Sequence, residues 1–217
     1  QSGPCCVVPD NGGGTADHPP SCPNGYVGHM QIVDGFPSGS TIQIPSNLGG
    51  FTNLVQTPGG LLGGNSETWQ ATIQMQMTGT GLFSSYNRVL NFPISAGTTH
   101  SAPRTPFSPV QSFSTDLYSL FGVLPFGDPD FDLLRITAGT AYGMPSPGYT
   151  IFSAAGPGWA VDSFFDITYR IDFIGKSSGP FGGYSGSTTR THRFLMCHEQ
   201  PTSVRPGTWG ALKALYR

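Results

Sequence analysis

Three aspartates at alternate positions are the densest group of acidic residues in the sequence. They stand in "GDPDFDLLR", as Asp128, Asp130 and Asp132. Carboxylate oxygens gathered in a loop are the ligands that Ca²⁺ prefers. The spacing of an EF-hand is absent, and Pro129 favours a simple rigid turn. The aspartates therefore leave a calcium site open, and the sequence suggests no other cofactor.

Four cysteines define the redox chemistry of the chain: Cys5, Cys6, Cys22 and Cys197. An even number of cysteines in a chain of this kind is typical of an oxidising compartment, and four cysteines allow three pairings. We expect at least one disulfide that ties the N-terminal segment to the body of the protein. An intermolecular bridge is an alternative. A zinc site is less favoured, because the nearby histidines do not have a known ligand spacing.

Nucleophilic catalysis finds little support in the sequence. "GYSGS", at 183–187, lacks the G-x-S-x-G spacing between a strand and a helix, and a hairpin turn explains its Gly and Ser equally well. Cys197 stands beside His198, but in a chain with four cysteines a disulfide is the better interpretation. We expect no catalytic residues and predict that the protein is not an enzyme.

Charge is scarce along the whole chain. Charged residues make up 10% of the 217 residues, and the net charge is −2, against about 25% charged residues in a typical soluble domain. Without a basic block, nucleic acid and anionic membranes are poor partners. No apolar run approaches the roughly 20 residues that span a bilayer, so membrane insertion is not expected.

The first residue suggests where the protein works. The sequence begins at Gln1 rather than Met. A secreted protein begins in this way after its signal peptide is removed. Together with the cysteines, this predicts a secreted protein, extracellular or at the cell surface.

Alternating polar and apolar residues predict the main structural elements. In "ETWQATIQMQMT", at 67–78, the residues from Trp69 to Met77 alternate between a large apolar set and an uncharged polar set. A strand with period two places these sets on opposite faces of a sheet. A second alternation runs through 165–173, and Gly- and Pro-rich turns separate about nine or ten such segments.

This pattern predicts an all-β protein with an antiparallel β-sandwich of jelly-roll type. An extended Gly/Pro/Cys-rich arm covers 1–28, the sandwich covers 29–200, and a C-terminal tail covers 201–217. Trp209 and Leu212 have helical spacing within "GTWGALKALYR", which indicates a short amphipathic helix that must dock to be stable.

Several stretches together resemble a known kind of domain. They are "HSAPRTPFSPVQSFSTDLYSL", "GDPDFDLLRITAGTAYGMPSPGYT", "WAVDSFFDITYRIDFIG" and "SGSTT". These sequences resemble an uncharacterised β-rich domain of large secreted or surface proteins of environmental bacteria, over roughly residues 29–196. The resemblance implies secretion and a surface role without catalysis. It implies no catalytic or binding residues.

The uncharged polar face of 67–78 leads to the functional hypothesis. Water-exposed strands normally carry Lys, Glu or Arg, which keep copies of a protein apart. We therefore expect a structural subunit that assembles with itself into an extracellular filament, sheath or surface layer. The arm, about 90 Å long when extended, would add a donor strand at "CCVVP" to a neighbouring subunit. The candidate contact residues are Val7, Val8, Thr68, Gln70, Thr72, Gln74, Gln76, Trp209 and Leu212.

The alternative function is a monomeric adhesive module that binds glycans. Sandwich domains bind sugars on exposed aromatic side chains, and several aromatic residues stand in or near turns. They are Tyr26, Tyr86, Tyr142, Tyr149, Trp159 and Tyr184. Aromatic residues at turns also cap hydrophobic cores. A structure separates these interpretations by showing which of the rings are buried.

Overall fold

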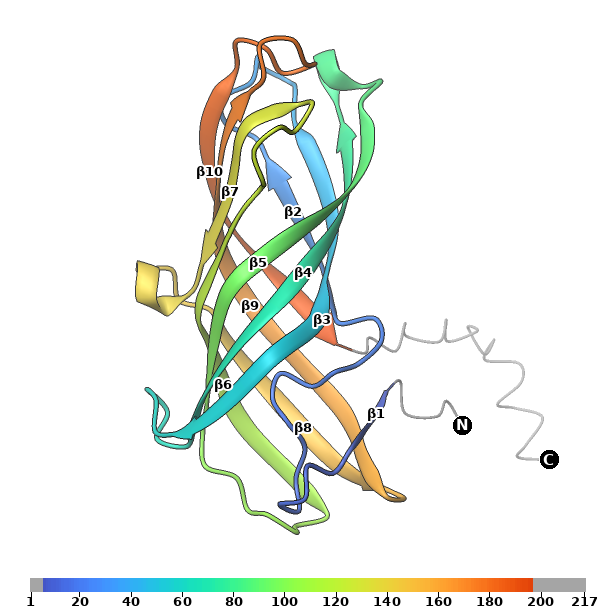
Figure 1. Cartoon of the computed structure of the whole chain (residues 1–217), viewed down its shortest axis with the longest axis vertical. Helices are drawn as coiled ribbons and strands as arrows, with labels where there is room; N and C mark the ends of the chain where they lie inside the picture. The colour runs from blue at the N-terminus through green and yellow to red at the C-terminus, as the bar shows by residue number, and fades with distance from the viewer. Residues whose placement is uncertain (1–5, 197–217) are drawn as a thin grey trace, which may run out of the picture.

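The computed structural model describes residues 6–196, and its elements are strands joined by turns and two short 3₁₀ segments (Figure 1). The strands are β1 (Val7–Pro9), β2 (Tyr26–Ile32), β3 (Ile42–Pro58), β4 (Asn65–Gly79), β5 (Asn87–Ser101), β6 (Val110–Val123), β7 (Phe131–Ala138), β8 (Pro147–Ala155), β9 (Gly158–Gly175) and β10 (Ser185–Met196). The 3₁₀ segments are η1 (Gly81–Phe83) and η2 (Thr140–Tyr142). The predicted all-β class is confirmed. The predicted C-terminal helix, with Trp209 and Leu212, lies outside the described residues, as do Cys5 and Cys197.

The strands form one antiparallel sheet of ten strands that closes on itself. Its order is β1-β9-β10-β2-β3-β4-β5-β6-β7, and β7 pairs with β9 to complete the ring. β8 lies between β6 and β9 where those two strands diverge. The predicted sandwich of two sheets is therefore not confirmed. Alternation reports only that one face of each strand is buried, and a closed sheet meets that condition as well as a sandwich does.

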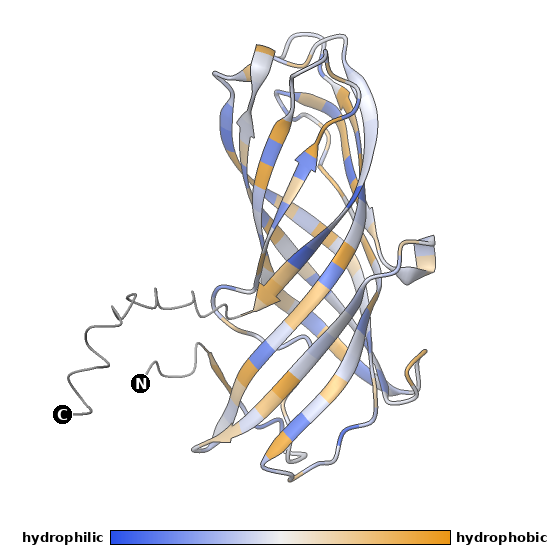
Figure 2. Ribbon diagram, turned by 180° about the vertical axis from the view of Figure 1, so that it is seen from behind, coloured by the Kyte–Doolittle hydropathy of each residue, from blue (hydrophilic) through white to orange (hydrophobic). Residues whose placement is uncertain are grey.

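The alternation that predicted the strands also sets the inner and outer faces. In β4, Trp69, Ile73 and Met77 are buried, while Thr68, Gln70 and the following polar residues are exposed or half-buried. In β9, the apolar residues from Phe165 to Phe173 are buried in the same manner. Figure 2 shows the resulting alternation of hydrophobic and hydrophilic bands along the long strands. Trp69 packs directly over Gly97 of β5, where a side chain would collide with the ring.

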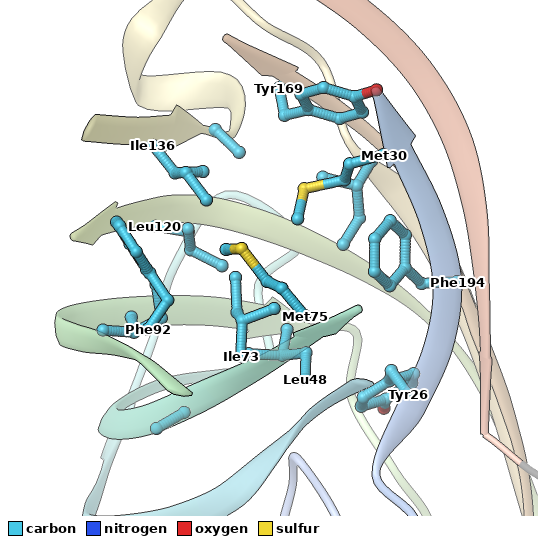
Figure 3. Close-up of a cluster of buried hydrophobic side chains, with 14 of the residues drawn as sticks. Tyr26, Met30, Leu48, Ile73, Met75, Phe92, Leu120, Ile136, Tyr169 and Phe194 are labelled. Atoms are coloured by element: carbon cyan, nitrogen blue, oxygen red, sulfur yellow. The ribbon is translucent and has the colours of Figure 1, made fainter. Parts of the chain in front are cut away.

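The interior is filled by side chains from all around the sheet. Met30, Leu48, Ile73, Leu120 and Phe194 meet in the centre (Figure 3). They leave a void of about 10 Å³, which is at most the space of one water molecule. This void therefore has no room for a ligand. In the described part of the chain, no helix has the length and hydrophobicity needed to span a membrane.

The N-terminal arm folds against its own chain. Val7 and Val8 pair with Ala160 and Trp159 in β9, and the side chain of Val8 is buried. The segment does add a strand to a sheet, as the sequence predicted, but the acceptor is β9 of the same chain. Docking of this segment on a neighbouring subunit stays a prediction. β9 extends beyond β10 at this end and offers its free edge within immediate reach of the arm.

One disulfide lies within the arm. Cys6 and Cys22 are bonded, with their Cα atoms 5.8 Å apart. The bridge joins the residue before β1 to the segment that leads into β2, so it closes the arm into a loop. The expected bridge between the arm and the body of the protein is not formed by this pair, because both cysteines belong to the arm. The loop itself crosses the lower end of the closed sheet (Figure 1).

Candidate functional site

Three neighbouring strands present an outer surface without formal charge. The outward positions of β3, β4 and β5, as the structure describes them, carry no Lys, Arg, Asp or Glu. We call this surface the uncharged face. Its residues are Gln43, Pro45, Asn47, Thr52, Val55, Thr68, Gln70, Thr72, Gln74, Gln76, Thr78, Asn87, Val89, Asn91, Pro93 and Thr98. The face includes Thr68, Gln70, Thr72, Gln74 and Gln76, which the sequence predicted to share one side of a strand.

Side-chain amides hold part of this face in place. Asn53 donates from Nδ2 to Oε1 of Gln70 at 2.6 Å, and Gln70 donates from Nε2 to the carbonyl oxygen of Ser95 at 3.3 Å. Gln76 donates in the same way to Asn87 of β5. These bonds run across β3, β4 and β5 and limit the rotamers of long side chains. A surface ordered in advance loses less conformational entropy on binding than a free one.

A recess of about 350 Å³ is hollowed into the uncharged face. We call it the recess. Its outward side chains are Val27 of β2, Pro45 and Asn47 of β3, Gln74 and Gln76 of β4, and Val89 of β5. Val27 and Val89 are both more than half exposed. The recess thus combines aliphatic walls with amide groups and holds no charge.

The sequence pointed to only two of the recess residues, Gln74 and Gln76. Val27, Pro45, Asn47 and Val89 were not foreseen. Each lies on a different or more distant strand, and the pairing of β2, β3, β4 and β5 brings them together. The local signal was present in β5, where Val89 alternates with buried Leu90 and Phe92 and so had to face outward.

The strands on the other side of the closed sheet carry paired charges. In β10, Arg193 binds Asp166 of β9 at 2.7 Å. Asp172 of β9 accepts from Arg135 at 2.9 Å and from Arg170 at 2.8 Å. We call the outward positions of β7, β9 and β10 the charged face. The bond to Arg193 lowers the pKa of Asp166. Burial acts to raise the pKa of Asp172, but hydrogen bonds from Ser187, Arg135 and Arg170 outweigh it and lower the pKa.

The one carboxylate of β3, β4 and β5 points inward and is buried under the arm. Glu67 accepts from Ser101 at 2.9 Å and from Nη2 of Arg104 at 3.0 Å. Arg104 also donates to the carbonyl oxygen of Ala16 in the arm at 2.8 Å. Burial raises the pKa of Glu67 to about 7, although its bonds to Ser101 and Arg104 oppose the shift. Burial likewise lowers the pKa of Arg104, so desolvation outweighs the pairing for both partners.

Other residues of the arm make further contacts with the sheet. Thr15 donates to Oε1 of Gln111 at 2.6 Å, and Gln111 donates from Nε2 to the carbonyl oxygen of Gly14 at 2.7 Å. His18 is fully buried, with Nε2 3.2 Å from Oγ1 of Thr150. Burial, assisted by the charge of Arg104, lowers the pKa of His18 well below its usual value. This cluster anchors the arm and is closed to solvent.

The three aspartates do not form a calcium site in this structure. Arg88 binds both Asp128 and Asp130, and Tyr86 donates to Asp130 at 2.9 Å. The carboxylate oxygens that a cation requires are therefore used by a guanidinium. Asp132 lies on an outward, exposed position at the start of β7. Within residues 6–196, no group of three or more His, Cys, Asp or Glu is placed to hold a metal ion.

The aromatic residues considered for glycan binding do not share one surface. Tyr26 and Trp159 are buried in the core. Tyr142 lies on η2 and Tyr149 on β8, and both are exposed. Tyr86 and Tyr184 instead line a depression of about 540 Å³ beside Leu82 and Pro180. The predicted platform thus reduces to one pair of tyrosines.

No family model, curated protein or solved structure matches the chain. The resemblance to a surface-protein domain therefore stays a prediction, and the functional argument rests on the geometry of the chain itself.

Proposed function

We propose that this protein is a secreted structural subunit that assembles with copies of itself through the uncharged face. The observation that carries the proposal is the unequal distribution of charge around one closed sheet. Ion pairs cover β7, β9 and β10, whereas β3, β4 and β5 expose amides, hydroxyls and aliphatic groups. The disulfide between Cys6 and Cys22 is consistent with an extracellular location.

The chemistry of the uncharged face favours a protein contact over permanent exposure to water. Burying an amide that finds a hydrogen-bond partner costs far less than burying an unpaired charge. The cores of protein interfaces are accordingly depleted of charged residues. Three strands of about 15 residues present roughly 700 Å², against about 800 Å² per partner in a standard interface. Because the outer surface of a closed sheet is convex, a neighbouring copy touches only part of it. A single contact is therefore weak, and a stable assembly needs many such contacts.

Phe126 is the side chain best suited to fill the recess of a neighbouring copy. It stands in the turn between β6 and β7 and is fully exposed. An aromatic ring gains most from burial among aliphatic groups such as Val27 and Val89. The turn and the recess are different surfaces, so this contact is head-to-tail. Contacts of that type propagate into open chains when the rotation between copies does not close.

Complementation between two variants tests this proposal. Gln76→Lys places a charge in the recess, and Phe126→Ser removes the ring. Each variant alone is expected to remain monomeric at concentrations where the wild type forms large species in analytical ultracentrifugation.

Mixed in equal amounts, the two variants should form pairs, since one retains the ring and the other an intact recess. A wild type that sediments as a 22.9 kDa monomer at the highest concentration contradicts self-assembly. Polymers formed by either variant alone contradict the role given to the recess.

The depression beside Tyr86 and Tyr184 favours a second candidate function, a glycan-binding module. Two tyrosines at one opening can stack on a sugar ring, and Ser85 adds a hydroxyl group. A glycan array with wild type and Tyr184→Ala tests this function. Glycan binding by the wild type that is lost in Tyr184→Ala supports this function. An array on which the wild type binds no glycan contradicts it.

A further inference from the structure

The closed sheet has one incomplete junction, between β2 and β10. Within residues 6–196, these strands share a single register pair, Leu195 with Val27. Beyond it, side chains replace the backbone ladder. The hydroxyl of Tyr169 accepts from the backbone N–H of Gln31 at 3.0 Å, and Figure 3 shows this hydroxyl directed at β2. Thr188 Oγ1 accepts from the N–H groups of Val33 and Asp34 at 3.1 and 3.0 Å.

Two histidines face each other across this junction. His29 lies on β2 between Val27, which pairs with β10, and Gln31, which is bound by Tyr169. His192 lies on β10 and stacks on Tyr169, with the ring centroids 6.1 Å apart. The two imidazole centroids are 5.7 Å apart at an angle of 63°. Both side chains are half-buried.

This separation suits two imidazoles that share one metal ion. With metal–nitrogen bonds of about 2.0–2.1 Å, each ring centroid lies roughly 3.2 Å from the ion. With the two centroids 5.7 Å apart, the angle at the ion between the two metal–nitrogen bonds is wide, but metal ions tolerate it. Solvent can supply the remaining ligands, because both histidines are partly exposed. Imidazole favours Cu²⁺, Ni²⁺ and Zn²⁺, and Cu²⁺ binds most tightly in this series.

We propose that His29 and His192 form a two-histidine site for a divalent transition metal, which clips β2 to β10 where backbone pairing is missing. Burial is the largest cause of the lowered pKa of His192, and the charges of His29 and Arg190 act in the same direction. The guanidinium of Arg190 also opposes a bound cation. The remaining charges near the junction are Asp34, beside Val33, and Arg193, which Asp166 neutralises.

Thermal unfolding of the full chain with added metal tests the site. Cu²⁺ and Ni²⁺ should raise Tm by about 5 °C at roughly 100 times the dissociation constant, and Mg²⁺ should not. His29→Gln and His192→Gln should each abolish the rise. Arg190→Ala retains both imidazoles and should bind the metal several-fold more tightly. Tm values without metal show whether each variant is folded.

Two results would overturn the site. One is a wild type whose Tm does not respond to Cu²⁺ or Ni²⁺. The other is a response of the same size in the two histidine variants, which would place the bound metal elsewhere on the chain.

Discussion

The uncharged face and the charged face belong to the same closed sheet and have the same backbone architecture, yet their side chains follow different rules. On the charged face, guanidinium and carboxylate groups pair across β7, β9 and β10. On the uncharged face, amides bind one another and aliphatic side chains surround the recess. Strand pairing and core packing are therefore satisfied equally well with or without surface charge.

The difference teaches that the few charged residues of this protein are distributed unevenly over its surface. A chain under no pressure to carry charge would lack it on every side. Here three ion pairs lie on the outer surface of β7, β9 and β10, and β4 turns its only carboxylate, Glu67, into the interior. Such an asymmetry is expected when one surface is covered by protein and the other stays in water.

Adding positive charge to the uncharged face has the largest expected effect on self-association. Gln74→Lys with Gln76→Lys should weaken self-association roughly a hundredfold or more, because each contact would bury unpaired charge. The matched control, Thr189→Lys with Thr191→Lys, places the same change on exposed positions of β10. Sedimentation at several concentrations gives the association constants. If both double variants weakened self-association equally, the two faces would not differ in their role in assembly.

Glu67→Gln tests why β4 carries its carboxylate inside. Its pKa of about 7 in the folded state is raised above the ordinary 4.5, so the folded protein holds this proton more tightly than the unfolded chain. The stability of the wild type relative to Glu67→Gln should therefore be highest below pH 4.5. It should fall by roughly 3 kcal/mol as the pH rises through 7.

Urea unfolding of both proteins between pH 4.5 and 8 measures this difference. The titration of His18 is common to both proteins and largely cancels in the comparison. Parallel stability profiles over this range would show that Glu67 does not titrate near neutral pH.

Removing the disulfide separates the role of the arm from that of the uncharged face. Cys6→Ser with Cys22→Ser opens a loop whose ends are 16 residues apart, and should lower the free energy of unfolding by about 3 kcal/mol. Self-association of the folded protein should not change, because the arm docks on its own β9. If this variant stayed folded but lost assembly, the arm rather than the face would be the contact.

Removing a charge from the charged face should matter least. Asp172→Asn breaks the bonds to Arg135 and Arg170, which are both substantially exposed. The expected loss is at most about 1 kcal/mol of stability, with no change in assembly. Thermal unfolding and sedimentation measure both quantities. A larger loss of association would give this face a role in the contact.

The strands could be predicted because alternation is a local property. The apolar residues from Trp69 to Met77 point inward as predicted. Glu67 stands two residues before Trp69, so the same alternation also predicts that its side chain points inward. The closure of the sheet could not be predicted in this way. It depends on pairs such as Arg135 with Asp172, which are far apart in sequence and leave no local signal.

The candidate site was predictable only in its central strand. Gln74 and Gln76 follow from the period of β4, whereas Val27 and Val89 join them through the pairing of separate strands. The docking segment of the arm was recognised from Val7 and Val8, but its acceptor was not. Sequence could not name the free edge of β9 as the acceptor, because that edge forms only when the long strands pair.

Hydroxyl-radical labelling of exposed aliphatic side chains tests the central claim most directly. Val27 and Val89 report on the recess and Ile174 on the charged face, and all three are about half exposed in the single chain. On going from dilute to concentrated protein, labelling of Val27 and Val89 should fall while that of Ile174 stays constant. Protection of Ile174 with unchanged valines, or identical labelling at every concentration, would contradict the account.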